Sequence, residues 1–112
     1  MEIKYYMYNI LNGLAFSHSK GIAHLDLKNA NIVINQRTHE LNIIDWGLSD
    51  FMSLHKEYKR KGTINYMPPE MLLGFKCYDF TVDVWSAGCV FGSMMFRSYH
   101  SIFKGQSDAE IL

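Results

Sequence analysis

Four polar side chains between residues 24 and 47 have the types and spacing that phosphoryl transfer requires. Asp26, Lys28 and Asn31 lie close together in the chain, and Asp45 follows two short apolar segments. In transfer from a magnesium nucleotide, one carboxylate orients the attacking hydroxyl and accepts its proton, and an ammonium neutralises the phosphoryl group. An amide oxygen and a second carboxylate hold the metal. The sequence therefore predicts Asp26 as general base, Lys28 as the stabilising cation, and Asn31 and Asp45 as Mg²⁺ ligands.

A short hairpin is predicted to bring the fourth polar group back beside the first three. The segments Ile32–Asn35 and Leu41–Ile44 are rich in β-branched and apolar residues, which is typical of strands. The polar run 36–40 between them predicts the turn. Asp45 then follows a strand directly, and Gly47 permits the sharp turn away from the metal.

Two helices are predicted from the spacing of apolar residues. The first covers residues 3 to about 19, and Gly21 just beyond it is a good stop signal. Its predicted core face comprises Ile3, Met7, Ile10, Leu11, Leu14 and His18. The second covers residues 81 to about 97 with Thr81 as its N-cap, and it is apolar nearly all round, which is typical of a buried helix. A G-x-x-x-G membrane-dimerisation helix is the alternative, but polar residues interrupt a segment already too short to span.

The polar cluster resembles the catalytic loop of protein kinases, H-R-D-L-x-x-x-N. Here it is His24-Leu25-Asp26-Leu27 followed by Asn31. Further motifs occur in the kinase order: Asp45-Trp46-Gly47 resembles D-F-G, Pro68-Pro69-Glu70 resembles A-P-E, and Asp83–Cys89 resembles the helix that anchors the kinase C-lobe. Three features narrow the resemblance: Trp46 in the Asp45-Trp46-Gly47 triplet, and the segments Met7–Leu11 and Tyr78–Thr81. With these features the chain is most similar to casein kinase II catalytic (alpha) subunits.

The resemblance implies a fold and an activity. The fold is expected to be mainly α, a partial kinase domain over residues 1–112 with one short β-hairpin, lacking the N-lobe and the final C-lobe helices. The activity is expected to be that of a casein kinase II-like serine/threonine protein kinase using ATP and Mg²⁺, with Lys28, Asn31 and Asp45 contacting the metal nucleotide. No Gly-rich loop or strand lysine is present, so we expect the isolated chain to be inactive. The alternative is a degenerate kinase remnant that binds partners without chemistry.

The resemblance also places an activation segment at residues 48–70. Thr63 matches the Ser or Thr that bridges the catalytic Asp and Lys of kinases, and Gly62 gives it backbone freedom. His24 is expected to be structural. Leu25 stands where the family usually has an Arg that grips a phosphate or carboxylate, so Leu is expected only to pack.

The stretch from His55 to Lys61, which is rich in basic residues, lies in the predicted activation segment. It is either a solvated loop face or a subsite for acidic protein substrates, formed by Lys59, Arg60 and Lys61. The resemblance also leaves open a regulatory subunit as a partner.

Composition narrows the class of protein further. The chain has 112 residues, is 48% hydrophobic and carries no formal net charge, which favours one globular domain without a nucleic-acid partner. Cys77 and Cys89 have no metal spacing and are expected to be reduced, buried thiols of a protein in the cytoplasm or nucleus. No apolar run is long enough for a membrane span.

Overall fold

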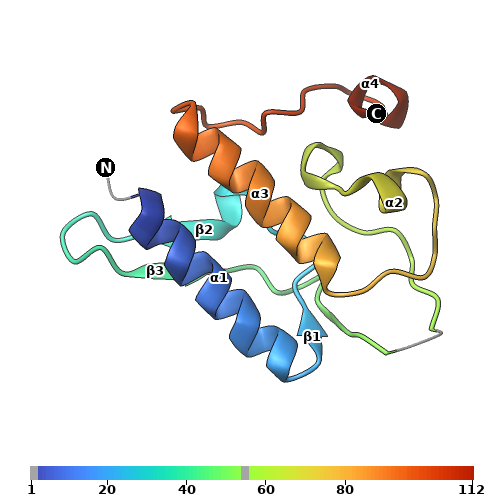
Figure 1. Ribbon diagram of the computed structural model, residues 1–112, viewed down its shortest axis with the longest axis horizontal. Helices are drawn as coiled ribbons and strands as arrows, with labels where there is room; N and C mark the ends of the chain where they lie inside the picture. The colour runs from blue at the N-terminus through green and yellow to red at the C-terminus, as the bar shows by residue number, and fades with distance from the viewer. Residues whose placement is uncertain (1–2, 54–55) are drawn as a thin grey trace.

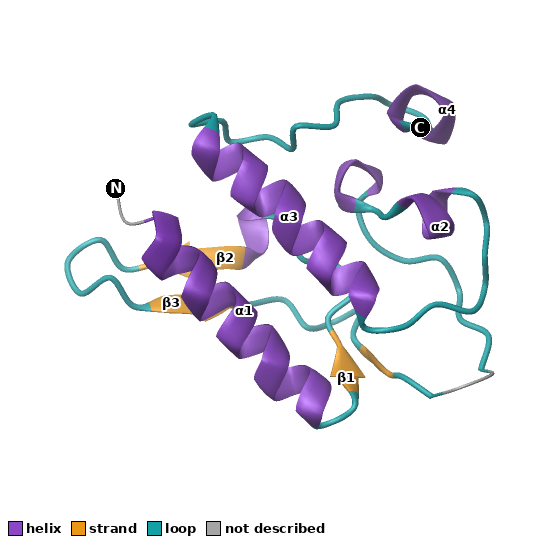
Figure 2. Ribbon diagram, in the orientation of Figure 1, coloured by secondary structure: helices purple, strands orange, loops and turns teal. Residues whose placement is uncertain are grey.

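The protein is built on two long helices and a small hairpin, as seen in a computed structural model that describes residues 3–53 and 56–112. Helices α1 (Ile3–Ser19) and α3 (Thr81–Met95) lie side by side, and the hairpin of β2 (Ile32–Ile34) and β3 (Leu41–Ile43) packs beside α1 (Figure 1). The shorter elements are β1 (Ile22–Ala23), η1 (Asn29–Asn31), β4 (Asp50–Phe51), η2 (Ile64–Tyr66), α2 (Pro69–Leu72) and α4 (Asp108–Ile111). Figure 2 shows that helix outweighs strand, so the predicted mainly α fold is confirmed.

Helix α1 has the predicted bounds, but its buried face is rotated slightly from the predicted one. Ile10 and Leu14 are buried as expected, whereas Leu11 is 46% exposed and Tyr6 is buried in its place. The helix ends where predicted, since Gly21 adopts a left-handed φ of 81° and donates its N–H to the carbonyl of His18.

The hairpin forms with the predicted strands, each one residue shorter. Ile32 pairs with Ile43, and Ile34 with Leu41. A side chain closes the turn, because Asn35 Oδ1 accepts hydrogen bonds from two backbone N–H groups of the polar run. β1 and β4 pair antiparallel and tie the end of α1 to the start of the activation segment, a pairing that the sequence did not predict.

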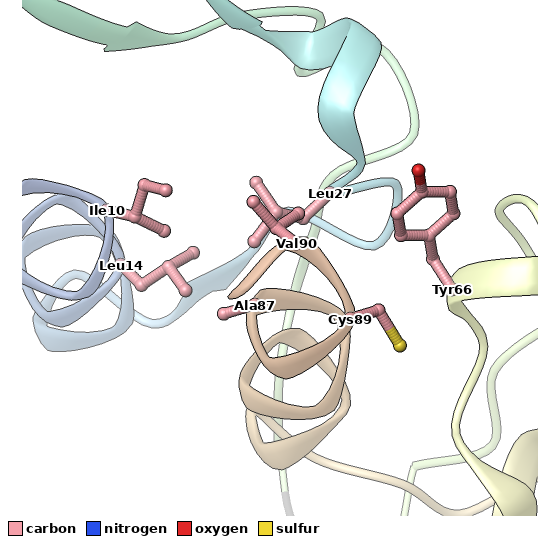
Figure 3. Close-up of a cluster of buried hydrophobic side chains, with 7 residues drawn as sticks. All are labelled: Ile10, Leu14, Leu27, Tyr66, Ala87, Cys89 and Val90. Atoms are coloured by element: carbon pink, nitrogen blue, oxygen red, sulfur yellow. The ribbon is translucent and has the colours of Figure 1, made fainter. Parts of the chain in front are cut away.

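Helix α3 provides the centre of the core on one face only. Figure 3 shows its buried residues Ala87, Cys89 and Val90 with Leu14 of α1 and Leu27 of the catalytic loop. The opposite face is open, with Val84 53% and Met95 56% exposed. The prediction of a helix buried nearly all round is therefore wrong for this face, because apolar composition alone does not say which side a neighbour covers.

The start of α3 also differs from the prediction. Phe80 occupies the N-cap position and Thr81 lies inside the helix, so Thr81 is not the cap. Asp79 performs the capping instead: its Oδ1 accepts the hydroxyl and the backbone N–H of Thr81. These hydrogen bonds lower the pKa of Asp79. Its stabilising contribution is thus present at neutral pH and is lost as the pH falls below the carboxyl's ordinary range.

Two further sequence predictions are settled by burial and helix length. Cys89 is buried, and burial raises the pKa of its thiol, but Cys77 is exposed, so its predicted burial is wrong. Within residues 3–53 and 56–112, no helix has the length and apolarity to cross a bilayer.

Candidate active site

Three of the predicted site residues meet through one hydroxyl group. Lys28 Nζ donates to Thr63 Oγ1 over 3.0 Å, and Thr63 Oγ1 donates to Asp26 Oδ1 over 3.1 Å. Lys28 Nζ also lies 3.9 Å from Asp26 Oδ2. Thr63 comes from the segment before η2, so the hydroxyl joins the activation segment to the catalytic loop. The carboxylate and ammonium are thereby held side by side in a partly exposed position.

The activation segment approaches the catalytic loop so closely that only glycine fits at position 62. A Cβ on Gly62 would lie 2.6 Å from the carbonyl oxygen of Leu25 and 3.8 Å from Asp26 Oδ1. Its φ of 106° is also in the region that side chains disfavour. Gly62 therefore sets the distance between Thr63 and the catalytic loop.

The phosphoryl-transfer role predicted from the sequence can be tested here: in the full-length protein, Gly62→Ala should lower kcat/KM by at least about tenfold, because the clash with the Leu25 carbonyl must displace Thr63 from Asp26. Gly74→Ala is the matched control: Gly74 also has a positive φ, 87°, but nothing lies within 4 Å of the added Cβ. Both variants carry the backbone strain, of about 1–2 kcal/mol, and only Gly62→Ala carries the clash. The measurement is kcat/KM of both variants by steady-state kinetics. An equal loss of kcat/KM in both would show that Gly62 matters only for its backbone conformation.

Asn31 is oriented as a metal ligand would need to be. Its side chain is buried, and Nδ2 donates to the carbonyl of Asp26 over 2.8 Å. This hydrogen bond fixes the amide orientation and leaves Oδ1 without a partner among the residues that the structure describes. A free amide oxygen is a hard ligand suited to Mg²⁺.

Asp45 is exposed and placed by the backbone around it. Ile44 donates its N–H to the carbonyl of Asn31 over 2.8 Å, and Asp45 itself has a left-handed φ of 58°. The indole N–H of Trp46 donates to the carbonyl of Ile43 over 2.9 Å, which holds the turn. The backbone thus returns from β3 to Asn31, and no hydrogen bond or ion pair joins the Asp45 carboxylate to Asp26, Lys28 or Asn31 in the described residues. One carboxylate and one amide fit Mg²⁺, which binds through few protein groups together with substrate phosphates and water.

His24 has a structural role only. It is fully buried; its Nδ1 accepts the N–H of Asp26, so Nε2 carries the proton and donates to the carbonyl of Ile44. Both ring nitrogens are used, and the ring packs edge-on against Trp46. His24 therefore connects the two halves of the site and has no nitrogen left for chemistry.

A buried carboxylate of α3 accepts hydrogen bonds from the backbone of the catalytic loop. Asp83 of α3 is 1% exposed and accepts the backbone N–H groups of His24 and Leu25 over 2.7 and 3.0 Å. It also binds Nε2 of His18 over 2.9 Å, a contact that sequence reasoning missed because the two residues lie far apart in the chain. Leu25, held in a left-handed conformation, packs into an apolar cluster with Met67.

The predicted basic subsite is partly occupied by the chain's own carboxylates. Arg60 binds both carboxylate oxygens of Asp108, and Lys61 Nζ lies 3.5 Å from Asp50 Oδ2. Lys59 is exposed and has no acidic partner within residues 3–53 and 56–112. His55, which belongs to the same run, lies outside the described residues. Among the described residues, Lys59 is therefore the one predicted substrate-binding cation that forms no ion pair with a carboxylate of this chain.

Comparison with known proteins agrees with this geometry. The family model for the protein kinase domain matches residues 1–112, and the chain belongs to the protein kinase family. The chain is also 42% identical, over 112 residues and 99% of its own length, to a probable casein kinase II subunit alpha homolog of Encephalitozoon cuniculi. It spans about a third of the length of that relative, since it covers 35% of it.

Proposed function

We propose that this chain provides the catalytic loop, metal ligands and activation segment of a casein kinase II-like serine/threonine protein kinase. The observation that carries the proposal is the Thr63 hydroxyl joined to both Asp26 and Lys28. This bridge holds a carboxylate and an ammonium beside one another, and both side chains are partly exposed. Asn31 and Asp45 supply the amide and carboxylate oxygens that a magnesium nucleotide needs.

Each residue has a distinct task in the proposed reaction. Asp26 accepts a hydrogen bond from the substrate hydroxyl, orients it and takes its proton. Lys28 neutralises charge on the phosphoryl group as a point charge. Asn31 and Asp45 would hold Mg²⁺, which, when bound with ATP, neutralises charge on the β- and γ-phosphates. Thr63 keeps Asp26 and Lys28 in register while the substrate binds.

The substrates of the proposed kinase are serine and threonine residues of proteins, and its location is the cytoplasm or nucleus. A regulatory subunit belongs to the proposal as a partner, by analogy with casein kinase II. Leu25 favours the second candidate function, a remnant that binds partners without chemistry, because Leu offers no donor where kinases commonly have Arg. The intact group of Asp26, Lys28, Asn31 and Thr63 favours the enzyme.

The decisive experiment is an assay of the full-length gene product with radiolabelled ATP and a mixed protein substrate. We expect Mg²⁺-dependent transfer that yields phosphoserine and phosphothreonine, and loss of transfer in Lys28→Met. Residues 1–112 alone should transfer no phosphate, because no Gly-rich loop in them positions the nucleotide. A full-length protein that binds neither ATP nor Mg²⁺ and transfers nothing would establish the remnant.

We further predict that kinase activity will not depend on phosphorylation of the activation segment. A phosphate orders such segments mainly through contacts with Arg, and Leu25 offers none. Tyr58 is buried, and its hydroxyl accepts the N–H of Ser53 and donates to the carbonyl of Phe51, so packing already holds the segment. Phosphatase treatment should leave kcat unchanged. A large fall in kcat would mean that another cation, such as Lys56, has taken the role of the missing Arg.

A further inference from the structure

The activation segment is held against a chain segment that follows α3, here called the strap and defined as residues 100–111. Figure 1 shows the strap running from the end of α3 towards α4, past the loops around α2. Nδ2 of Asn65 donates to the carbonyls of Phe103 and Gly105, each over 3.1 Å, and the Ser101 hydroxyl donates to the carbonyl of Asn65. The strap is therefore fixed to the residues immediately after Thr63.

The activation segment to which the strap is fixed carries Thr63, whose hydroxyl donates to the proposed base Asp26. A protein substrate whose hydroxyl reaches Asp26 therefore has its neighbouring residues near the activation segment. Arg60 is three residues from Thr63, so their Cα atoms are at most about 11 Å apart. Side chains two or three positions from the acceptor residue are therefore within range of Arg60.

Arg60 already holds a carboxylate of the strap. Its guanidinium donates to both oxygens of Asp108, the bidentate arrangement that a substrate Asp or Glu would seek. The same contact raises the pKa of Arg60 and lowers the pKa of Asp108, so both groups are charged at neutral pH. A substrate carboxylate must either use the N–H donors that Asp108 leaves free, on a guanidinium whose charge is already neutralised, or displace Asp108 in exchange. That exchange replaces one ion pair by another and leaves little net gain in affinity.

We propose that Asp108 is a specificity-determining residue that neutralises Arg60 from within the chain and so weakens selection for acidic side chains near the acceptor. The proposal rests on the proposed kinase function. It corrects the expectation that Lys59, Arg60 and Lys61 act together as an acidic-peptide subsite. Lys61 is similarly engaged by Asp50, which leaves Lys59 as the cation of the three that can attract a substrate carboxylate without an exchange.

The test compares two variants that each remove one negative charge from α4 in the full-length protein. Asp108→Asn frees Arg60. Glu110→Gln is the matched control, because Glu110 accepts a hydrogen bond from the N–H of Gln106, which Gln can still accept, and pairs with no described cation. The probes are two serine peptides, one with Asp and Glu flanking the acceptor and one with Asn and Gln in the same positions. The measurement is the acidic-to-neutral ratio of kcat/KM at low and high salt.

Asp108→Asn should raise this ratio about two- to fivefold at low salt, the effect expected of one exposed ion pair, and salt should reduce the rise. Glu110→Gln should leave the ratio near wild type, and the double variant Arg60→Gln, Asp108→Asn should return it there. An unchanged ratio in Asp108→Asn, or an equal rise in Glu110→Gln, would overturn the proposal. Circular dichroism melts check that the variants fold.

Peptide binding keeps this proposal separate from the proposed function. Fluorescence anisotropy with the same two peptides measures affinity without any chemistry. If no variant phosphorylates either peptide but Asp108→Asn binds the acidic peptide more tightly, the kinase proposal fails and the role of Asp108 stands. If wild-type protein phosphorylates both peptides and Asp108→Asn changes neither the kcat/KM ratio nor the affinity, only the role of Asp108 fails.

Discussion

Asp26→Asn should lower kcat by about 10²–10⁴-fold while leaving the protein folded, because asparagine has the same shape and no basic oxygen. The amide oxygen can still accept the Thr63 hydroxyl, so the position of the activation segment is kept. What is lost is the acceptor for the substrate proton. KM for the protein substrate should change little, since the contact matters most in the transition state.

Stopped-time assays with labelled ATP on the full-length protein give kcat and KM for this variant. Asp50→Asn is the control, because it removes a carboxylate of the activation segment that lies outside the catalytic group, beside Lys56 and Lys61. A kcat for Asp26→Asn within about tenfold of wild type would exclude Asp26 as the general base. An equal loss of kcat in both variants would mean that kcat depends on the total negative charge of this region and not on the position of Asp26.

The local features of this site could be predicted from sequence because they depend on residues close together in the chain. The β-branched and apolar residues of 32–35 and 41–44 predicted both strands of the hairpin, and the polar run between them predicted its turn. Once the hairpin is known, Asp45 must return towards Asn31. The stop at Gly21 is likewise a local signal. The bridging position of Thr63 came from the family resemblance, since nothing in its own neighbourhood indicates the contact with Asp26.

The features that could not be predicted depend on which segments pack together. Asp79 caps α3 instead of Thr81, and both are common cap residues two positions apart, so propensity cannot separate them. The open face of α3 carries the large apolar residues Val84, Phe91 and Met95, whereas its buried face includes Asp83, Ser86 and Ser93, so apolar composition does not indicate which face is covered. The pairs Arg60–Asp108 and His18–Asp83 join residues 48 and 65 positions apart, and a charge pattern along the chain holds no information about them.

Asp83 is expected to be the most important single residue for stability, because three donors depend on its carboxylate. Two are backbone N–H groups of the catalytic loop, from His24 and Leu25, and the third is the ring of His18 in α1. The carboxylate thus connects both long helices with the loop that carries Asp26. At 1% exposure, water cannot replace it as an acceptor.

Asp83→Ala should destabilise the protein by about 3–5 kcal/mol, since it leaves buried donors unsatisfied and opens a void. A typical domain has only about 5–15 kcal/mol of stability, so the variant should be partly unfolded at physiological temperature. Asp83→Asn should be less harmful, because its amide oxygen still accepts one or two of the hydrogen bonds while its NH₂ faces a donor.

Urea unfolding of the full-length protein measures these differences through the shift of the midpoint. The expected order of midpoints, from highest to lowest, is wild type, Asp83→Asn and Asp83→Ala. Asp50→Asn should keep the wild-type midpoint, because its lysine partners are at least partly exposed to solvent. Activity should fall in the same order in the absence of urea, since Leu25 is held in its left-handed conformation partly by Asp83 and directly precedes Asp26. A wild-type midpoint for Asp83→Ala would mean that other contacts, such as the packing of Leu25 in its apolar cluster, hold the loop without the carboxylate.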